Sequence, residues 1–420
     1  MYIGEIMIKK LAVVGMIVSF AWLVIEKSDH AFAQDCEQAQ EFYSEGVALS
    51  DGTEQEANYY RQALTVCPQY AEAHYRLAHV YAGWGQYQEA MAEFQAALRL
   101  TPQYAEAYNG LGETYYNQGY YDEAMKNFRQ ALHQRPGYLL PHIGLGRIYA
   151  QRGMFRESTQ EFLQILEKDP ENLDINYELG RVYEKSGDLD KALQYYLAMK
   201  RLAPKRDDIS ARLGSLYRKQ KAYESAIREF KYALSLNPYN LAVQRELAIL
   251  YYDQKQYNDA MNLLLEVLRL RATDAEALEY LGKIYFTRRE YDKAIETFRE
   301  AVQYDPRNIN AHYYLGFIYI GKGSYQEAMS ELQEVLRLNP SHPEALFQLS
   351  IIHGERKELE KAIELCRRAI TINPDLPGGQ YTLGNLYVKL GKQELEKAAS
   401  RPSASPDLRK KIETLGKLGY

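Results

Sequence analysis

Catalytic motifs are absent from this chain of 420 residues, and the residues that usually build them are scarce, with three cysteines and eight histidines. The sequence contains no CxxC pair, no HExxH pair and no GxxxxGK[ST] loop, the spacings that hold a zinc ion or a nucleotide phosphate. The formal net charge of −5 is mild and has the wrong sign for a nucleic-acid-binding face. We therefore predict that the protein is not an enzyme and has no metal site, no cofactor and no nucleic-acid partner.

Long apolar runs are also missing, with one exception near the N-terminus. Lys9 and Lys10 precede an apolar stretch at residues 11–25, and the small residues Ala31 and Ala33 follow it. This order is typical of a secretory signal that is cleaved after residue 33. The stretch is shorter than the roughly 17–25 residues of a membrane-spanning helix. We predict a signal peptide at residues 1–33, with an uncleaved membrane anchor as the alternative, and either one places the rest of the chain outside the cytoplasm.

What the chain does contain is a strict repeat, visible first in its prolines. Nine prolines fall on one constant interval, the interval from Pro68 to Pro102, and Ala272 occupies the one mark in the series where proline is missing. The series consists of Pro68, Pro102, Pro136, Pro170, Pro204, Pro238, Pro306, Pro340 and Pro374. A constant period of this size, between about 20 and 50 residues, indicates a repeat architecture.

The same residue types return at the same positions when the chain is aligned on this period. Nine units run from residue 71 to residue 376, with Leu at position 7, a small residue at position 8, Tyr at position 11 and Ala at position 20 in nearly every unit. Position 24 is usually large. In the unit that begins at Ala105, these residues are Leu111, Gly112, Tyr115, Ala124 and Phe128.

These positions predict two short helices in each unit. Positions 4, 7, 8 and 11 lie on one face of a helix, and positions 20, 24 and 27 lie on one face of a second helix. Helices of about 13 residues are marginally stable alone, so each one needs a partner face. The proline at position 32 cannot continue the second helix and therefore separates one unit from the next.

These residues and their spacing resemble the tetratricopeptide repeat family. The resemblance implies an all-α fold, a right-handed superhelical solenoid in which each repeat is a pair of antiparallel helices and the first helices line a concave groove that receives partner segments. We expect the solenoid to occupy residues 34–400, with a divergent repeat at 37–70, nine repeats at 71–376 and a partial capping repeat at 377–400. A basic tail at 401–420 follows.

The two outlying cysteines of the first repeat are candidates for a disulfide. Cys36 opens the first predicted helix and Cys67 closes the second, and these ends lie side by side in an antiparallel pair. Because the chain is predicted to be exported to an oxidising compartment, we predict a Cys36–Cys67 bond, with two unpaired thiols as the alternative. Cys366 stands at position 24, where we expect a buried apolar residue.

Candidate binding residues lie on the first helix of each unit, opposite its packing stripe. Positions 2, 5, 6, 9, 12 and 13 point away from positions 4, 7, 8 and 11. In the middle units this face is charged, with Glu178, Glu184 and Asp208 among several basic residues, which predicts either docking of an acidic segment or simply a solvated face. The basic residues are Arg147, Arg181, Lys185, Arg212, Arg218 and Lys219.

In the later units the same face becomes aromatic and apolar, although core packing is not expected to require this. Such a surface predicts an interaction site, because exposed apolar patches and aromatic anchors mark binding interfaces. Burial by curvature of the array, or by a C-terminal segment that folds back, is the competing explanation. The candidates are Tyr280, Phe286, Tyr313, Tyr314, Phe317, Phe347, Ile351 and Tyr381.

We predict a scaffold for protein–protein interaction in the bacterial cell envelope, which binds segments of partner proteins from an assembly or export machinery. Two alternatives stay open. One is an accessory subunit that binds glycan or peptidoglycan, with sugar rings stacked on the tyrosines. The other is an adaptor that recruits an enzyme and is anchored in the inner membrane through residues 11–25. The predicted location is periplasmic or secreted, with a single-pass inner-membrane protein as the alternative.

Overall fold

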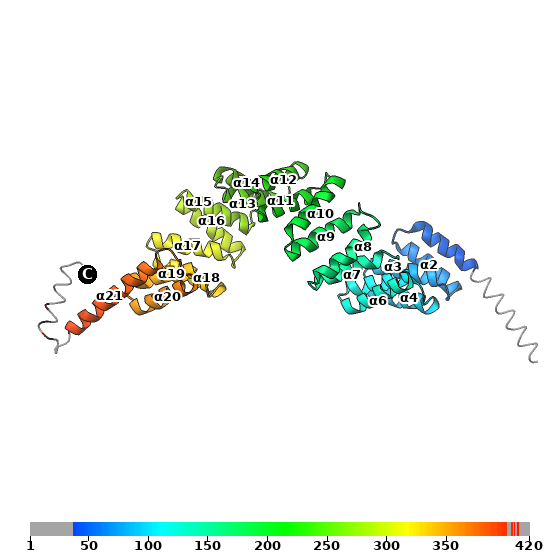
Figure 1. Cartoon of the computed structure of the whole chain (residues 1–420), viewed down its shortest axis with the longest axis horizontal. Helices are drawn as coiled ribbons and strands as arrows, with labels where there is room; N and C mark the ends of the chain where they lie inside the picture. The colour runs from blue at the N-terminus through cyan, green and yellow to red at the C-terminus, as the bar shows by residue number, and fades with distance from the viewer. Residues whose placement is uncertain (1–36, 401–404, 406, 408–409, 411–420) are drawn as a thin grey trace, which may run out of the picture. The chain divides into compact units, whose positions relative to one another are not determined.

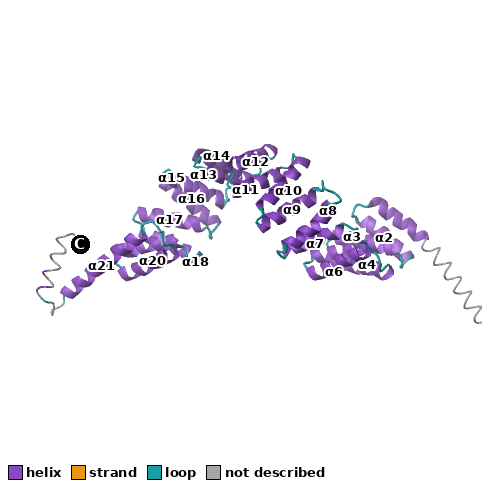
Figure 2. Ribbon diagram, in the orientation of Figure 1, coloured by secondary structure: helices purple, strands orange, loops and turns teal. Residues whose placement is uncertain are grey.

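The computed structural model describes residues 37–400 together with residues 405, 407 and 410, and in this part of the chain it contains α-helices and no strand. Figure 1 shows the succession of helices along the chain, and Figure 2 shows that loops are the only other structure between them. The chain divides into two compact units, one that ends at Pro204 and one that begins at Lys205. The all-α repeat fold expected from the sequence is confirmed.

Among the described residues of the first unit, residues 37–49 are helical and nine further helices follow them. These are α2 (Glu54–Val66), α3 (Ala71–Gly83), α4 (Tyr87–Leu100), α5 (Ala105–Asn117), α6 (Tyr121–Gln134), α7 (Leu140–Gln151), α8 (Phe155–Leu166), α9 (Leu173–Ser186) and α10 (Leu189–Leu202).

Up to residue 400, the second unit contains ten helices of nearly equal length followed by one longer helix. These are α11 (Asp207–Lys219), α12 (Tyr223–Leu236), α13 (Leu241–Asp253), α14 (Tyr257–Leu270), α15 (Ala275–Thr287), α16 (Tyr291–Tyr304), α17 (Ile309–Gly321), α18 (Tyr325–Leu338), α19 (Pro343–Glu355), α20 (Leu359–Ile372) and α21 (Gly379–Ala399).

Within each repeat, the two helices are joined by a tight turn with one residue in the left-handed region. This residue stands at position 15, where Gly119 has φ 80° and Arg289 has φ 62°. A left-handed residue after a helix end allows the chain to reverse at once, and glycine adopts this conformation without steric cost. The turn therefore sets the antiparallel helix pair.

The core of each repeat is organised around the large residue at position 24. Phe128 of α6 is buried, and a Cβ atom added to Gly112 of the same repeat would lie 2.7 Å from its ring. A Cβ atom at Gly144, in the next repeat, would lie 2.3 Å from the same ring. Glycine at positions 8 and 6 thus allows two first helices to close on one aromatic side chain, because even a methyl group would collide with the ring.

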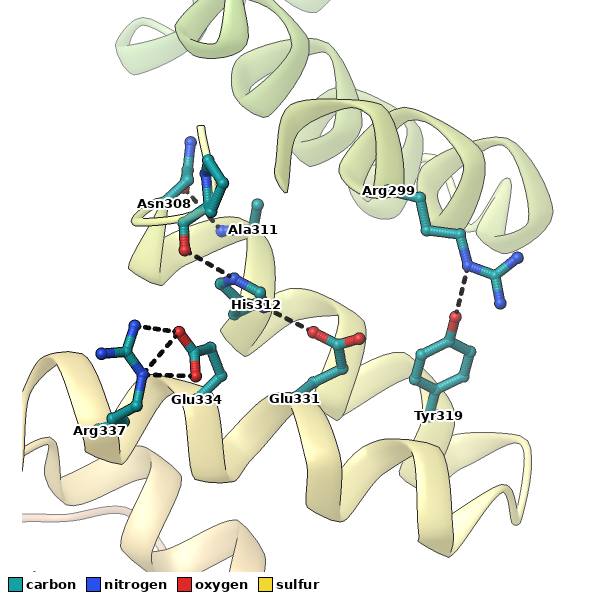
Figure 3. Close-up of polar contacts among 9 residues, drawn as sticks. Arg299, Asn308, Ala311, His312, Tyr319, Glu331, Glu334 and Arg337 are labelled. Carbon is teal, nitrogen blue, oxygen red and sulfur yellow. Dashed lines mark hydrogen bonds and ion pairs between the residues drawn. The ribbon is translucent and has the colours of Figure 1, made fainter. Parts of the chain in front are cut away.

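The tyrosines at position 11 connect neighbouring repeats as well as filling space. Arg299 of α16 donates a hydrogen bond of 2.9 Å from Nε to the hydroxyl of Tyr319 in α17 (Figure 3). The same contact joins Arg61 to Tyr81 at 3.1 Å and Arg129 to Tyr149 at 3.1 Å. Position 11 is therefore a polar link between successive repeats, in addition to the packing role expected from the sequence.

The first helix of each repeat is buried over a wider arc than the sequence pattern predicted. Positions 3 and 10 are buried in all nine repeats. Within each unit, a first helix packs against its own second helix, against neighbouring first helices and against the second helix that precedes it in that unit. At position 10 the buried residues are Val80, Thr114, Ile148, Val182, Leu216, Leu250, Ile284, Ile318 and Ile352.

The last helix packs differently from the other first helices. The partial capping repeat is a single helix, α21, of 21 residues. Nothing lies within 4 Å of a Cβ atom added at Gly384, which stands at position 8, and the neighbouring Val388 is 56% exposed. Among the described residues, no second helix packs against this face of α21.

Candidate interaction surfaces

Position 9 lies on the face of the first helices opposite the packing stripe, and its residues show how this face changes along the chain. It is occupied by Glu113 and Arg147 in the first unit and by Lys283 and Phe317 in the second. Because a whole number of repeat periods separates these residues, each one lies on the same face of its own helix. Position 9 therefore belongs to the face, opposite the packing stripe, on which the sequence analysis predicted the candidate binding residues.

Four of the predicted aromatic residues lie in contact in the second unit, and we call Phe286, Tyr313, Tyr314 and Phe317 the aromatic surface. The ring of Phe286 lies 5.1 Å from that of Tyr314 and 5.7 Å from that of Phe317, measured between centroids. Tyr313 is 5.7 Å from Tyr314 and 6.3 Å from Phe317. The ring of Phe286 meets its neighbours edge to face, which is a favourable arrangement for aromatic pairs.

The sequence expectation that core packing does not require apolar residues on this face is wrong for Tyr314. Its ring stacks on the buried ring of Phe298 at 5.3 Å, with 6° between the planes. Phe298 stands at position 24 of the preceding repeat, so Tyr314 at position 6 covers the same ring surface that Gly144 covers over Phe128. Tyr314 is therefore part of the core as well as of the aromatic surface.

A small cavity of about 250 Å³ opens beside the aromatic surface. Phe286, Tyr291, Phe317 and Lys322 contribute to its wall. Phe317 is 40% exposed, and Lys322 forms an ion pair with Asp292 rather than pointing freely into the cavity. The cavity is large enough for one apolar side chain, for which the two phenylalanine rings supply the contact surface.

Tyr280 lies on α15, the same helix as Phe286, and is half-buried. Its ring is 5.4 Å from that of Tyr252, and the Lys283 ammonium lies 4.3 Å from its centroid. Burial, and then the nearby Glu279 carboxylate, raise the pKa of Tyr280 to about 12. Burial also raises the pKa of Tyr313 and that of Tyr314. This face has therefore already lost part of its contact with water.

The remaining predicted aromatic and apolar residues do not join the aromatic surface in a common contact. Phe347 packs half-buried against the core near α21. Ile351 lines a separate cavity of about 640 Å³, together with Glu355, Thr382 and Lys389. Tyr381 is 76% exposed on α21.

The basic candidates fall into two groups, one in each unit. In the first unit, Arg147 and Arg181 both bind the carboxylate of Glu178, each at 3.1 Å. These three residues and Lys185 line a cavity of about 260 Å³. Three cations thus surround one carboxylate, and the cavity keeps a positive balance.

In the second unit, the basic candidates are three residues of α11. Arg218 pairs with Glu246 at 3.0 Å. Arg212 is half-buried and Lys219 is exposed. The ion pair of Arg218 reduces the positive charge available to an acidic segment. Docking of such a segment stays a prediction for both groups.

Three residues of the aromatic region were missed in the sequence analysis. Tyr252 stands at position 12, the same position as Phe286, and the signal would have appeared had the aromatic face been followed one repeat earlier. Tyr291 stands at position 17, where tyrosine recurs in most repeats, and such recurrence indicates packing rather than a binding site. Lys322 lies in a turn at position 14, and the sequence analysis did not follow this position, so only the structure places Lys322 beside Phe317.

The structure describes one of the two cysteines of the predicted disulfide. Cys67 is disulfide-bonded and 4% exposed, whereas its predicted partner, Cys36, lies outside the described residues. The Cys36–Cys67 pairing therefore stays a prediction. Cys366 is a free thiol buried at position 24, where an apolar role was expected.

No cluster of three or more histidine, cysteine, aspartate or glutamate side chains suited to a metal ion occurs within the described residues. None of the helices in the same part of the chain is both long and apolar enough to span a membrane. The predicted signal or anchor at residues 1–33 lies outside the described residues.

Family models for tetratricopeptide repeats match most of the chain. The models described as "Tetratricopeptide repeat" match residues 59–92, 105–138, 143–207, 217–284 and 315–377. A model described as "TPR repeat" matches residues 85–119 and 282–323. No curated protein sequence matches the chain.

Several solved structures are similar to the chain. One is YrrB, described as a TPR protein with an unusual peptide-binding site, at 21% identity and a TM-score of 0.39, over 44% of this chain and 96% of that one. A second is yeast Tom70, at 14% identity and a TM-score of 0.42, over 90% and 99%. A third is MamA from Desulfovibrio magneticus RS-1, at 24% identity and a TM-score of 0.38, over 40% and 96%. At this level of similarity, the neighbours carry no information about the partners of this chain.

Proposed function

Because the chain belongs to the tetratricopeptide repeat family, we propose that it is a non-enzymatic scaffold that binds segments of partner proteins on the aromatic surface of its second unit. The observation that carries the proposal is the environment of Phe317. This side chain is 40% exposed, although it touches Phe286 and Tyr313 and lines an open cavity. Contiguous apolar surface of this kind usually marks a site that another molecule covers.

The energetics of the aromatic surface suit a binding site. Its rings are held against one another and against Phe298, so little side-chain entropy is lost when a partner docks. Rigid aromatic anchors of this kind contribute a large share of the binding energy at protein interfaces. The half-buried tyrosines have already given up part of their hydration, which lowers the cost of covering them.

The ring geometry favours a protein segment over a sugar. Sugar rings would stack on flat aromatic faces that are open to solvent. On the aromatic surface, the planes of Phe286 and Phe317 are inclined by 76°, and those of Phe286 and Tyr314 by 63°. In such pairs the edge of one ring lies against the face of the other, so the rings do not form one flat stacking platform, and a small cavity with an apolar wall lies beside them. Such a cavity fits a leucine or phenylalanine side chain from a partner segment.

We place this scaffold in the bacterial cell envelope, as part of an assembly or export machinery. The support is the signal-like composition of residues 1–33 and the disulfide at Cys67, since disulfides persist in oxidising compartments. If residues 11–25 are retained, the protein becomes an inner-membrane-anchored adaptor. The intact mass of the protein purified from its native envelope distinguishes these two forms, because cleavage removes residues 1–33.

The binding proposal is tested with Phe317→Ala and a matched control, Tyr239→Ala. Tyr239 is an accessible aromatic residue of the second unit, 75% exposed, and it lies in a loop away from the aromatic surface. Wild-type protein and Tyr239→Ala should capture the same protein from an envelope extract in affinity purification, and Phe317→Ala should not. The thermal midpoints of all three should be similar, because Phe317 is not fully buried.

Two results would contradict the proposal. One is capture of the same protein by all three variants, which would place binding elsewhere on the array. The other is retention of peptidoglycan fragments instead of a protein by the wild type, with loss of this retention in Phe317→Ala. That outcome would favour the glycan-binding accessory subunit.

A further inference from the structure

His312 of α17 binds two acceptors at once. Its Nδ1 atom lies 2.6 Å from Oε2 of Glu331 in α18, and its Nε2 atom lies 3.2 Å from the carbonyl oxygen of Pro306 (Figure 3). Pro306 belongs to the loop that leads from the preceding repeat into α17. One imidazole ring therefore ties together the inter-repeat loop, the first helix of the repeat and its second helix.

The same arrangement occurs in the first unit, at the equivalent position 4. Nδ1 of His74 in α3 lies 2.5 Å from Oε2 of Glu93 in α4, and Nε2 lies 3.1 Å from the carbonyl oxygen of Pro68. Seven full repeat periods separate the two histidines along the chain. The structure therefore contains two copies of one device, one in each unit.

The two acceptors require a protonated ring. A carboxylate oxygen and a carbonyl oxygen can only accept hydrogen bonds, and a neutral imidazole has one N–H to donate. With a neutral ring, one of the two ring nitrogens would face an oxygen with no proton between them. Imidazolium donates from both nitrogens, so only the charged form satisfies both contacts.

The charged groups around each ring are mixed. Glu331 and Glu334 face His312 from α18, and Arg337 neutralises Glu334 by a bidentate ion pair (Figure 3). Glu93 and Arg99 face His74 from α4. The inter-repeat loops contribute the neutral carbonyls of Pro68 and Pro306. The directly bonded group is a carboxylate in both sites, so the local balance favours the cation.

Other repeats reach the same proline carbonyl with a side chain that does not titrate. Gln244 donates from Nε2 to the carbonyl oxygen of Pro238 at 2.8 Å, and Asn176 donates from Nδ2 to that of Pro170 at 3.2 Å. These amides make the loop contact at any pH. His142 offers the opposite comparison, because it bonds Glu161 at 2.6 Å and no proline carbonyl within the described contacts.

We propose that His74 and His312 are proton-dependent staples, which fasten the start of a repeat to the preceding proline loop and to its own second helix, and which loosen as the pH rises. Burial alone would lower the pKa of each histidine, but the bonds to the glutamate and to the proline carbonyl outweigh burial and raise it above 6.5. The stabilisation is fully present below the ordinary histidine pKa and is lost as the pH rises through the raised value. Mildly acidic conditions should therefore stabilise the contacts of His74 and His312 with the proline loops and with the second helices of their repeats.

The test uses the full chain and His312→Gln, which copies the natural contact of Gln244 and removes the titrating group. His133→Gln, at an exposed position of α6, is the matched control. Hydrogen exchange of the first turn of α17, corrected for the intrinsic effect of pH, is followed from about pH 5.5 to 8.5, the range in which histidine titrates. We expect protection to fall with rising pH in the wild type and in His133→Gln, by about tenfold for each unit of pKa elevation, and to stay level in His312→Gln.

A second measurement keeps the proposal falsifiable if His312→Gln folds poorly. In the wild type, the His312 ring should titrate above 6.5 by NMR of selectively labelled histidine, and in Glu331→Gln its midpoint should fall. A His312 midpoint at or below the ordinary histidine value in the wild type would overturn the proposal. So would an equal pH dependence of exchange in the wild type and His312→Gln.

Discussion

The two units build the same repeat with different residues at the same two positions. At position 15, in the left-handed turn, the first unit has glycine in every repeat, whereas the second has lysine or arginine in four of its five repeats. Position 34 is the last residue of a repeat and lies just before the first helix of the next one. Side chains at this position cap four first helices of the second unit, but in the first unit only Asn172 does so. The left-handed residues are Gly85, Gly119, Gly153 and Gly187 in the first unit and Lys221, Lys255, Arg289, Gly323 and Lys357 in the second.

This difference shows that packing, and not local preference, sets the geometry of the turn. A lysine or arginine has a steric cost in the left-handed region, yet Arg289 adopts φ 62° where Gly119 adopts φ 80°. The surrounding helices over-determine the turn, so the strain persists. In the second unit, the side-chain caps at the starts of the first helices offset part of this cost.

The surfaces of the two units differ for a related reason. In the first unit, the glycines at position 6 of two repeats, Gly110 and Gly144, lie directly on core rings, and the exposed face carries charged residues. In the second unit, Tyr314 replaces glycine at this position and stacks on Phe298, and further rings gather around it. Tyr314 at position 6 thus connects the core ring of Phe298 with the other rings of the aromatic surface.

The strongest destabilisation is expected from removing the ring at position 24 in each unit. Phe128→Ala and Phe298→Ala should each lower the free energy of unfolding by roughly 3–5 kcal/mol, because both rings are fully buried. Only Phe298→Ala removes the ring beneath Tyr314, so it alone should also weaken partner capture. Denaturant unfolding and affinity purification on both variants check this. Equal loss of capture would mean that the aromatic surface is not supported in this way.

A more modest effect is expected from exchanging the turn residues between the units. Nothing lies within 4 Å of a Cβ atom at Gly119, so Gly119→Ala acts through its positive φ alone and should lower the free energy of unfolding by roughly 1–2 kcal/mol. Arg289→Gly should raise it slightly, by less than about 1 kcal/mol, because relief of strain exceeds the added freedom of the unfolded chain. Gly83→Ala, which is also in open space but helical, is the control and should be stabilising. A loss at Gly83 as large as that at Gly119 would refute the conformational explanation.

The weakest effect concerns the caps of the second unit. The side chain of Asn308 accepts a hydrogen bond of 2.9 Å from the backbone N–H of Ala311 (Figure 3). Asn308→Ala should lower the free energy of unfolding by about 1 kcal/mol, whereas Asn308→Ser retains an acceptor and should be nearly neutral. In the first unit, Tyr104 precedes α5, makes no cap bond and contacts Tyr75 instead. Tyr104→Ser should therefore not be neutral as Asn308→Ser is, because it removes a ring contact and replaces no existing cap. Thermal or denaturant unfolding measures all three.

Much of the fold was predictable because its signals are local. The proline spacing, Leu111 and its equivalents, and the small residues at position 8 predicted the helix pairs, and the structure has them. The candidate site was predicted in part: Phe286, Tyr313 and Phe317 do lie in contact. The role of Tyr314 could not be predicted, because its partner, Phe298, belongs to the preceding repeat.

Contacts with the proline loops escaped the sequence analysis for the same kind of reason. His312 stands at position 4, on the face that the sequence pattern predicts to pack, although it binds Pro306 and Glu331. Both partners become neighbours only when the helix pair closes, and backbone carbonyls carry no signal in a sequence. The additional burial at positions 3 and 10 likewise depends on how closely successive repeats approach.

The residue pattern alone was enough to establish the period, the length of the helices and the residues on which each pair closes, because these follow from the 3.6-residue turn of a helix and from the chain breaks at proline. The packed structure was needed to tell which exposed ring is free and which is core, and which histidine bonds two acceptors. Those properties depend on atoms contributed by neighbouring helices and loops, and only the stacking of repeats brings such atoms into contact with one another.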